Sequence, residues 1–225
     1  MTGSTATVAS RGQLERYLRR APIGELCTLV DPFDPRWEGL LYEEQATRGA
    51  YDLAADDAEA GRHGLDVGFH RRWLHARRLR EEGRASLVGG PWLASEAPTP
   101  FVLDGRRYAS VACFHEALKL HEDDSERDAV ALGLSRDRRR IRPARRGTFV
   151  YAQEELVVGS PAHGGLVARA TEAKVDAHAE VRRALAATGR SLLFMGGRYG
   201  RAPQALGRFM PFALMVLRYR SKGRA

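Results

Sequence analysis

The chain has 225 residues, of which 44% are hydrophobic and 28% charged, and these values are typical of one globular domain with a short appendage. No apolar run is long enough to cross a bilayer, and the first residues lack the basic-then-apolar order of a secretory signal, so we expect a cytoplasmic protein with no membrane partner. The net charge of +8 fits either a polyanionic partner or an arginine-favouring genome, because all but three of the 36 basic residues are arginines.

The first 85 residues are predicted to form a helical extension. Apolar residues at helical spacing after a Ser10 cap predict a short helix over residues 10–20. The apolar, partly β-branched run Glu25–Val30 predicts a strand. Helical periodicity follows over residues 38–60 and again over 67–82, and we expect both segments to be supporting helices.

Residues 86–225 are predicted to form the main domain, because glycine and proline interrupt the helical pattern near residue 86. The predicted elements of this domain are a strand over 100–104 that ends in an Asp-Gly turn, a helix capped by Ser110, helices over 125–134 and 165–189, a strand at TFVYAQ, and a buried terminal helix or strand at PFALMVLRY. The predicted fold class is therefore α+β, mainly helical with a small sheet.

No metal or cofactor site is expected. The two cysteines, Cys27 and Cys113, are far apart and lack the paired spacing of a zinc or redox site. The histidines form no HExxH pattern, and His115 and His121 are six residues apart, which is wrong for two ligands on one helix face.

The helix that follows Ser110 carries the strongest candidate for chemistry. His115, Glu116 and Lys119 are three or four residues apart or adjacent, so they share one side of the helix. A carboxylate beside an imidazole and an ammonium can act as an acid–base group, since each neighbour tunes the pKa of the others. The same pattern also occurs on helix faces that are simply solvated, so the spacing alone leaves both interpretations open.

The stretch PFVLDGRRYASVACFHEALKL resembles the helix-entry motif of the NADAR superfamily. In that motif a strand and an Asp-Gly turn lead to an aromatic residue, a small hydroxyl residue and a Glu-His pair, followed by Gln-Ala and Lys. The matching residues here are Asp104, Gly105, Tyr108, Ser110, Ala117 and Lys119.

Three later segments match the same family in order. AKVDAHAEVRRALAATGRSLL is similar to a family helix, with Ala173, Lys174, His178, Leu185, Thr188 and Gly189 in register. SRDRRRIRP looks like the family's basic loop, and LMVLR is similar to its closing segment. The resemblance covers roughly residues 86–220.

The resemblance implies a largely helical α+β domain whose pocket binds a ribosyl-phosphate or ADP-ribose-like ligand and needs no cofactor. Family members cleave a ribose C1–N bond in small riboflavin-pathway intermediates or in ADP-ribosylated nucleic acid. Cleavage through an oxocarbenium-like state needs a carboxylate and a proton donor. The candidate ligand-binding residues are Tyr108, Ser110, Lys119, Arg136, Arg138, Lys174 and Tyr199.

The chain departs from the family at the reacting positions. Ala112 and Cys113 stand where the family has its Glu-His pair, Met195 stands where it has a later Glu, and an Asp-x-x-Trp-Gly motif is reduced to Tyr199-Gly200. Glu116, one turn beyond Ala112, could supply a displaced carboxylate, with His115 in place of the missing histidine. The alternative is a pocket that binds its ligand without catalysis.

A third possibility is nucleic-acid binding through the arginine run Arg136–Arg146. If the run only attracts the phosphate backbone, affinity for an unmodified oligonucleotide should fall steeply with salt and vanish near physiological ionic strength. A fluorescence-anisotropy titration across a salt series measures this. Tight, salt-resistant binding would instead rank nucleic-acid recognition above the ribosyl pocket.

Overall fold

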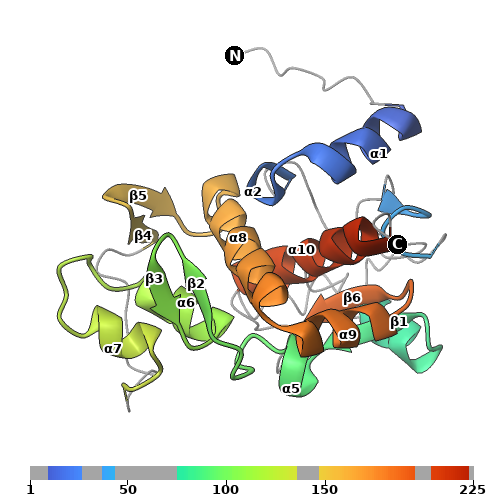
Figure 1. The fold of residues 1–225 in the computed structure, drawn as a ribbon. Coiled ribbons are helices and arrows are strands. Elements are labelled where there is room, and N and C mark those ends of the chain that lie inside the picture. The colour runs from blue at the N-terminus through green and yellow to red at the C-terminus, as the bar shows by residue number, and fades with distance from the viewer. Residues whose placement is uncertain (1–9, 27–36, 44–74, 136–146, 196–203, 223–225) are drawn as a thin grey trace, which may run out of the picture.

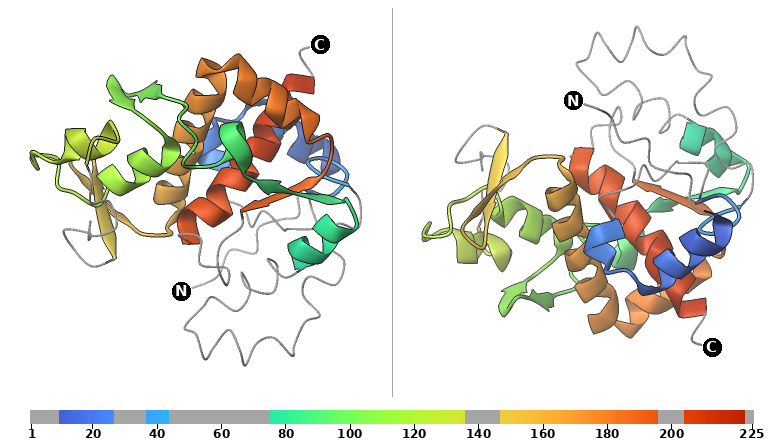
Figure 2. Two further views of the ribbon diagram at one scale, coloured as in Figure 1. Left: turned by 90° about the horizontal axis from the view of Figure 1, so that it is seen from below. Right: turned by 90° about the horizontal axis from the view of Figure 1, so that it is seen from above.

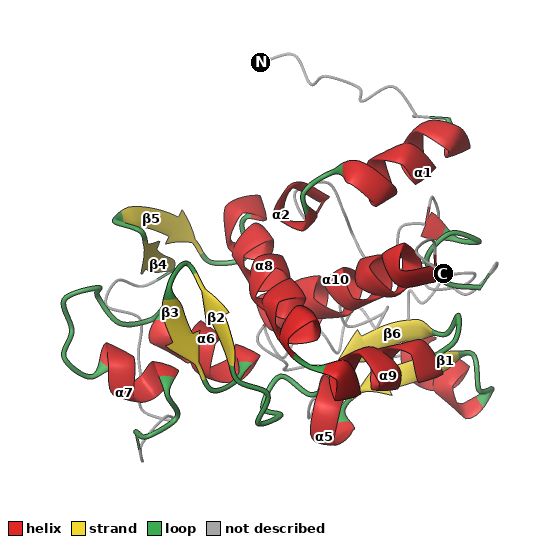
Figure 3. Ribbon diagram, viewed as in Figure 1, coloured by secondary structure: helices red, strands yellow, loops and turns green. Residues whose placement is uncertain are grey.

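The structure is a computed structural model, and it describes residues 10–26, 37–43, 75–135, 147–195 and 204–222. Helices dominate these ranges, and their strands pair as three two-stranded sheets, which agrees with the predicted α+β class (Figure 3). The helices are α1 (Arg11–Arg20), α2 (Ile23–Leu26), α5 (Gly90–Leu93), α6 (Val111–Ala117), α7 (Arg127–Ala131), α8 (Pro161–Ala177), α9 (Ala179–Ala187) and α10 (Gln204–Lys222). The strands are β1 (Ala85–Val88), β2 (Phe101–Leu103), β3 (Arg106–Tyr108), β4 (Thr148–Tyr151), β5 (Glu154–Val157) and β6 (Leu192–Met195).

Helices α8 and α10 cross at the centre of the molecule (Figures 1 and 2). Their close approach depends on Gly164, because a Cβ atom at this position would lie 2.5 Å from the ring of Phe209. From Phe209 to Leu217 every residue of α10 is buried. The predicted terminal segment is therefore confirmed as a buried helix. Within the described ranges, no helix combines the length and the apolar character that a membrane span requires.

The described part of the first 85 residues packs on this helix pair. Helix α1 begins at the predicted Ser10 cap, where the Ser10 hydroxyl accepts a hydrogen bond from the Gln13 amide and the Gln13 side chain bonds back to the Ser10 amide. Leu18, Ile23 and Leu26 are buried in the same core as α8 and α10. The extension, as far as it is described, therefore shares the hydrophobic core of the main domain.

Two sequence predictions in this region are wrong. Glu25 and Leu26, the described part of the predicted strand, belong to helix α2, because Ile23 and Leu26, one helical turn apart, are both buried and α2 packs on α8. Residues 38–43 form a turn with a bridge between Glu38 and Tyr42 rather than the start of a helix. The remainder of both segments lies outside the described residues. Of the next predicted helix, residues 75–81 are helical as expected.

The sheets connect segments that are distant in sequence. β1 pairs in parallel with β6, from Ala85 with Leu192 to Val88 with Met195, beneath α10. β2 and β3 form the predicted hairpin, and its turn residues Asp104 and Gly105 both have positive φ, as a two-residue turn of this kind requires. β4 and β5 form a second hairpin, of which the sequence predicted only the first strand.

The contact between α2 and α8 can be tested with one methyl group. A Cβ atom at Gly165 would lie 2.9 Å from the backbone oxygen of Gly24, so Gly165→Ala should lower the free energy of unfolding by about 1–3 kcal/mol through overpacking. Gly12→Ala on α1 is the matched control, since nothing lies within 4 Å of its new Cβ and alanine favours helix. Urea denaturation of both variants measures the difference. Equal stability of the two variants would show that α2 does not dock as described.

Candidate functional site

Helix α6 is positioned by its first residue and by an aromatic cluster. The Ser110 hydroxyl accepts a hydrogen bond from the Cys113 amide at 3.1 Å, which confirms the predicted N-cap. Phe114 packs edge-on against Tyr108, with ring centroids 5.0 Å apart, and lies near Phe101. These contacts fix which side of α6 faces the core, and the next residue, His115, packs against Phe149 of β4 and His163 of α8.

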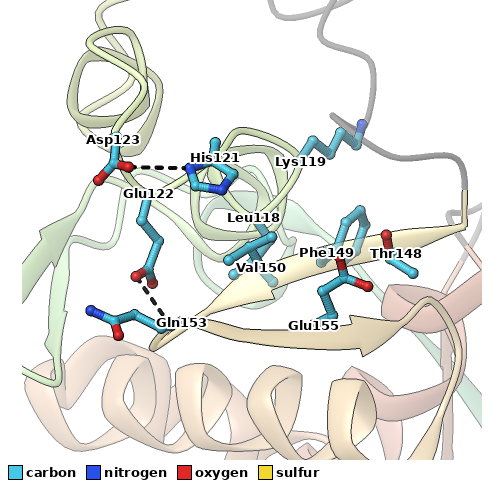
Figure 4. Close-up of a pocket in the computed structure, with 10 residues that line it drawn as sticks. All are labelled: Leu118, Lys119, His121, Glu122, Asp123, Thr148, Phe149, Val150, Gln153 and Glu155. Carbon is cyan, nitrogen blue, oxygen red and sulfur yellow. Dashed lines mark hydrogen bonds and ion pairs between the residues drawn. The ribbon is translucent and has the colours of Figure 1, made fainter.

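A cavity of about 550 Å³ lies between the end of α6 and the β4–β5 hairpin (Figure 4). Its lining residues come from the end of α6 and the turn that follows it, and from both strands of the hairpin. They are Leu118, Lys119, His121, Glu122, Asp123, Thr148, Phe149, Val150, Gln153 and Glu155. Of the sequence-predicted candidates that the structure describes, only Lys119 lines this cavity.

The cavity wall formed by the β4–β5 hairpin is fixed by hydrogen bonds to the Glu122 carboxylate and from the buried Arg127 guanidinium. Glu122 accepts hydrogen bonds from the amides of Ala152 and Gln153 at 2.6 and 3.1 Å, which supports a turn in which both residues have positive φ. Arg127 is buried and donates to the carbonyls of Leu120 and Val150 at 3.2 and 3.1 Å. The hairpin is thereby bonded to the chain that follows α6, which keeps the cavity walls in register.

Glu116 and Lys119 form a partly buried ion pair on the predicted face. The Lys119 ammonium donates to both carboxylate oxygens of Glu116 at 2.7 and 2.6 Å, and the two side chains are 20% and 21% exposed. Burial raises the pKa of Glu116, but His115 and Lys119 together more than offset this effect, so the pKa lies below its ordinary value. Glu116 is therefore a carboxylate at neutral pH, one side chain removed from the cavity.

His115 faces the interior rather than the cavity. Its imidazole is 4% exposed, packs edge-on against Phe149 and stacks on His163 with ring centroids 5.3 Å apart. Its Nδ1 atom lies 3.9 Å from Glu116, and neither ring nitrogen forms a hydrogen bond. Burial and the neighbouring His115 lower the pKa of His163 to about 4. Phe149 therefore separates a buried histidine pair from the cavity.

The other predicted ligand-binding residues lie elsewhere. Tyr108 is 2% exposed in the aromatic cluster, and Ser110 is buried as a helix cap. Lys174 is fully buried on α8, where its ammonium donates to the Ala94 carbonyl at 2.7 Å and burial lowers its pKa to about 8. Arg136, Arg138 and Tyr199 lie outside the described residues.

Among the described residues that line the cavity, acidic side chains outnumber basic ones. Glu122, Asp123 and Glu155 face the same space as Lys119 and His121, and the His121 ring lies 3.6 Å from Asp123 (Figure 4). Sequence reasoning missed these acidic residues because no periodic pattern links a post-helix turn to a distant hairpin. The sequence did offer one indication of an acidic wall: three consecutive acids follow His121 just after the predicted helix, in the run His-Glu-Asp-Asp.

Among the described residues, no group of three or more histidine, cysteine or acidic side chains is arranged to hold a metal ion. The ionisable side chains in or beside the cavity within the described ranges are Lys119, His121, Glu116 and the three acids of the lining. The chain matches no known family, no curated protein and no solved structure in the comparisons made with each of these groups.

The Lys119 contact can be tested by titration. Lys119→Met removes the ammonium and leaves burial as the dominant influence, so the pKa of Glu116 should rise, measured from the carboxyl shift by ¹³C NMR. Because the folded pKa lies below the ordinary 4.5, Glu116 stabilises the fold above that pH and loses this contribution as pH falls. Arg183→Met, which removes an exposed charge on α9, should leave the Glu116 titration unchanged. Unchanged titration in Lys119→Met would mean that the ion pair does not form.

Proposed function

We propose that this protein is a NADAR-like N-glycosidase-type hydrolase that cleaves a ribose C1–N bond, with Glu116 as the carboxylate that acts on the sugar. The single observation that carries the proposal is the ion pair of Glu116 with Lys119 at the wall of the 550 Å³ cavity. The substrate class is a ribosyl-phosphate, nucleotide or ADP-ribosyl compound, as the sequence resemblance implies.

The charge of the cavity supports this chemistry. Departure of the nitrogen from C1 leaves positive charge on the ribose ring, and nearby carboxylates stabilise such a cation in a partly dehydrated site. Glu122, Asp123 and Glu155 supply negative potential at the described wall, in addition to Glu116. The volume is within the range of cavities that hold small ligands, so a ribosyl group can be accommodated.

The proposed reaction is a hydrolysis. The C1–N bond breaks and its electron pair leaves with the nitrogen, while a water molecule forms a new C1–O bond and gives a proton to the Glu116 carboxylate. The departing nitrogen receives a proton from the Lys119 ammonium, which lines the cavity beside Glu116. His115 lies behind Phe149, so its role in this proposal is to position Glu116 rather than to touch the substrate.

A second candidate is a protein that binds the same ligand without cleaving it. Both carboxylate oxygens of Glu116 already accept hydrogen bonds from Lys119. At least one of these hydrogen bonds has to break before the carboxylate can contact a sugar. Ala112 is only partly buried on α6 and has no ionisable group to take over. In this candidate the ion pair serves only to shape the cavity.

Two variants distinguish the candidates. Glu116→Gln should keep the fold and ligand binding but lower the rate of sugar–nitrogen cleavage by several powers of ten, because loss of the charge that stabilises the cation costs several kcal/mol. Release of the base from a ribosylamine phosphate and from an ADP-ribosylated guanine oligonucleotide measures the rate. Glu180→Gln, an exposed acid in an i,i+3 ion pair on α9, is the matched control and should retain activity.

Ala112→Glu is the complementary variant. If the wild-type protein binds the ligand but is inert, and Ala112→Glu gains cleavage, the enzyme proposal fails and the binding candidate is established. If the wild-type protein cleaves and Glu116→Gln cleaves equally well, Glu116 is not the acting carboxylate.

A further inference from the structure

A second cavity lies at the last turns of α10. Figure 1 shows that this end of α10 lies on the opposite side of the molecule from the β4–β5 hairpin, which lines the first cavity. The second cavity has a volume of about 190 Å³ and is lined by the end of α1, residues 39–41, the turn after α9 and the last turns of α10. Four of its lining side chains are cationic: Arg19, Arg190, Arg218 and Lys222. No acidic residue lines it within the part of the chain that the structure describes.

The polar contacts of these cations are almost entirely with main-chain carbonyls. Arg190 donates to the Gly39 carbonyl at 2.9 Å, and Lys222 to the Gly189 carbonyl at 3.3 Å. The Arg19 guanidinium lies over the ring of Tyr219, 5.1 Å from its centroid. These contacts satisfy hydrogen-bond donors but bring no negative charge.

Arg218 is the most enclosed of the four cations. It is 2% exposed and donates to the carbonyls of Leu41 and Ser191 at 2.8 Å and to the Thr188 hydroxyl at 2.6 Å. Burial and the nearby Arg190 lower the pKa of Arg218 to about 10. A buried guanidinium normally acquires a carboxylate partner, because desolvation of an unpaired charge is costly. Among the described residues, Arg218 has none.

The surrounding peptide dipoles offset only part of this charge. The carboxyl ends of α9 and α10 both lie at the cavity, and each helix end carries the equivalent of about half a negative charge. Together they correspond to about one negative charge against four cationic side chains. The cavity therefore retains a positive excess, with Arg19, Arg190 and Lys222 exposed enough to meet a solute.

We propose that this basic cavity is an anion site that binds the phosphate group of a small phosphorylated molecule. A phosphate dianion accepts several hydrogen bonds at once from guanidinium forks and an ammonium, whereas a monocarboxylate brings one charge and two oxygens. The size of the cavity suits a phosphate group. The site does not depend on the proposed hydrolase chemistry, because its residues are remote from Glu116.

The experiment is isothermal titration calorimetry with inorganic phosphate at fixed ionic strength, maintained with sodium chloride. The wild-type protein should show saturable one-site binding. Arg190→Gln and Lys222→Gln should each weaken it about tenfold or more, since each removes a charge-assisted contact worth about 1.5–3 kcal/mol. Arg183→Gln removes the same charge from an exposed position on α9 outside the cavity lining, and it should bind within about threefold of the wild type because salt screens distant charges.

Two further titrations test which anion the cavity prefers and whether the site is independent of Glu116. Sodium acetate in place of phosphate should bind at least about tenfold more weakly, and Glu116→Gln should bind phosphate as the wild type does. Absence of saturable binding, or equal weakening in the Arg183 variant, would overturn the site. Equal affinity for acetate would overturn its assignment to phosphate.

Discussion

The close packing of α8 on α10 is the constraint on which the rest of the structure depends. Gly164 lets the Phe209 ring lie against the α8 backbone, and the next residue, Gly165, lets the Gly24 carbonyl of the N-terminal segment approach the same helix. Without side chains at these two adjacent positions, α8 accepts a neighbour on two sides. The parallel β1–β6 pair packs against α10, and the β2–β3 hairpin packs against α8 (Figures 1 and 2). One cavity then lies at the β4–β5 hairpin and the other at the last turns of α10.

Near each cavity, a different buried arginine donates hydrogen bonds to main-chain carbonyls of separate segments. Arg127 connects the chain after α6 to β4, and Arg218 connects α10 to residues 41, 188 and 191. The consequence differs because of the surrounding charge. Arg127 lies 3.9 Å from Glu122 in an acid-rich region, whereas every charged side chain that lines the cavity of Arg218 within the described ranges is cationic. The first cavity therefore suits a developing cation, and the second suits an anion.

Local patterns in the sequence predicted local structure well. The Ser10 and Ser110 caps, the Asp-Gly hairpin turn and the buried C-terminal helix each depend on neighbouring residues, and all four are present. The predicted Glu25–Val30 strand was wrong in its described part because a short apolar run does not distinguish a strand from a helix, and burial of Ile23 and Leu26 against α8 decided the outcome.

The candidate site could be predicted only where it is local to one helix. Spacing brought His115, Glu116 and Lys119 together, but burial turned His115 inward onto His163, which is 48 residues away in sequence. The acidic cavity wall and the basic cavity both join segments that only the tertiary fold brings together. Charge counting could not find them, because the arginine-rich composition places cations throughout the chain.

The most direct measurement of the central claim is amide chemical-shift mapping by NMR during titration with ADP-ribose. If the cavity beside Glu116 is the ribosyl site, saturable shifts should concentrate in residues 118–123 and 148–155, with any response at the basic cavity separable as a second set near 189–190 and 218–222. Saturable shifts that leave residues 118–123 and 148–155 unchanged would contradict the account, because the ligand would then bind away from the only ionised carboxylate proposed to act on it.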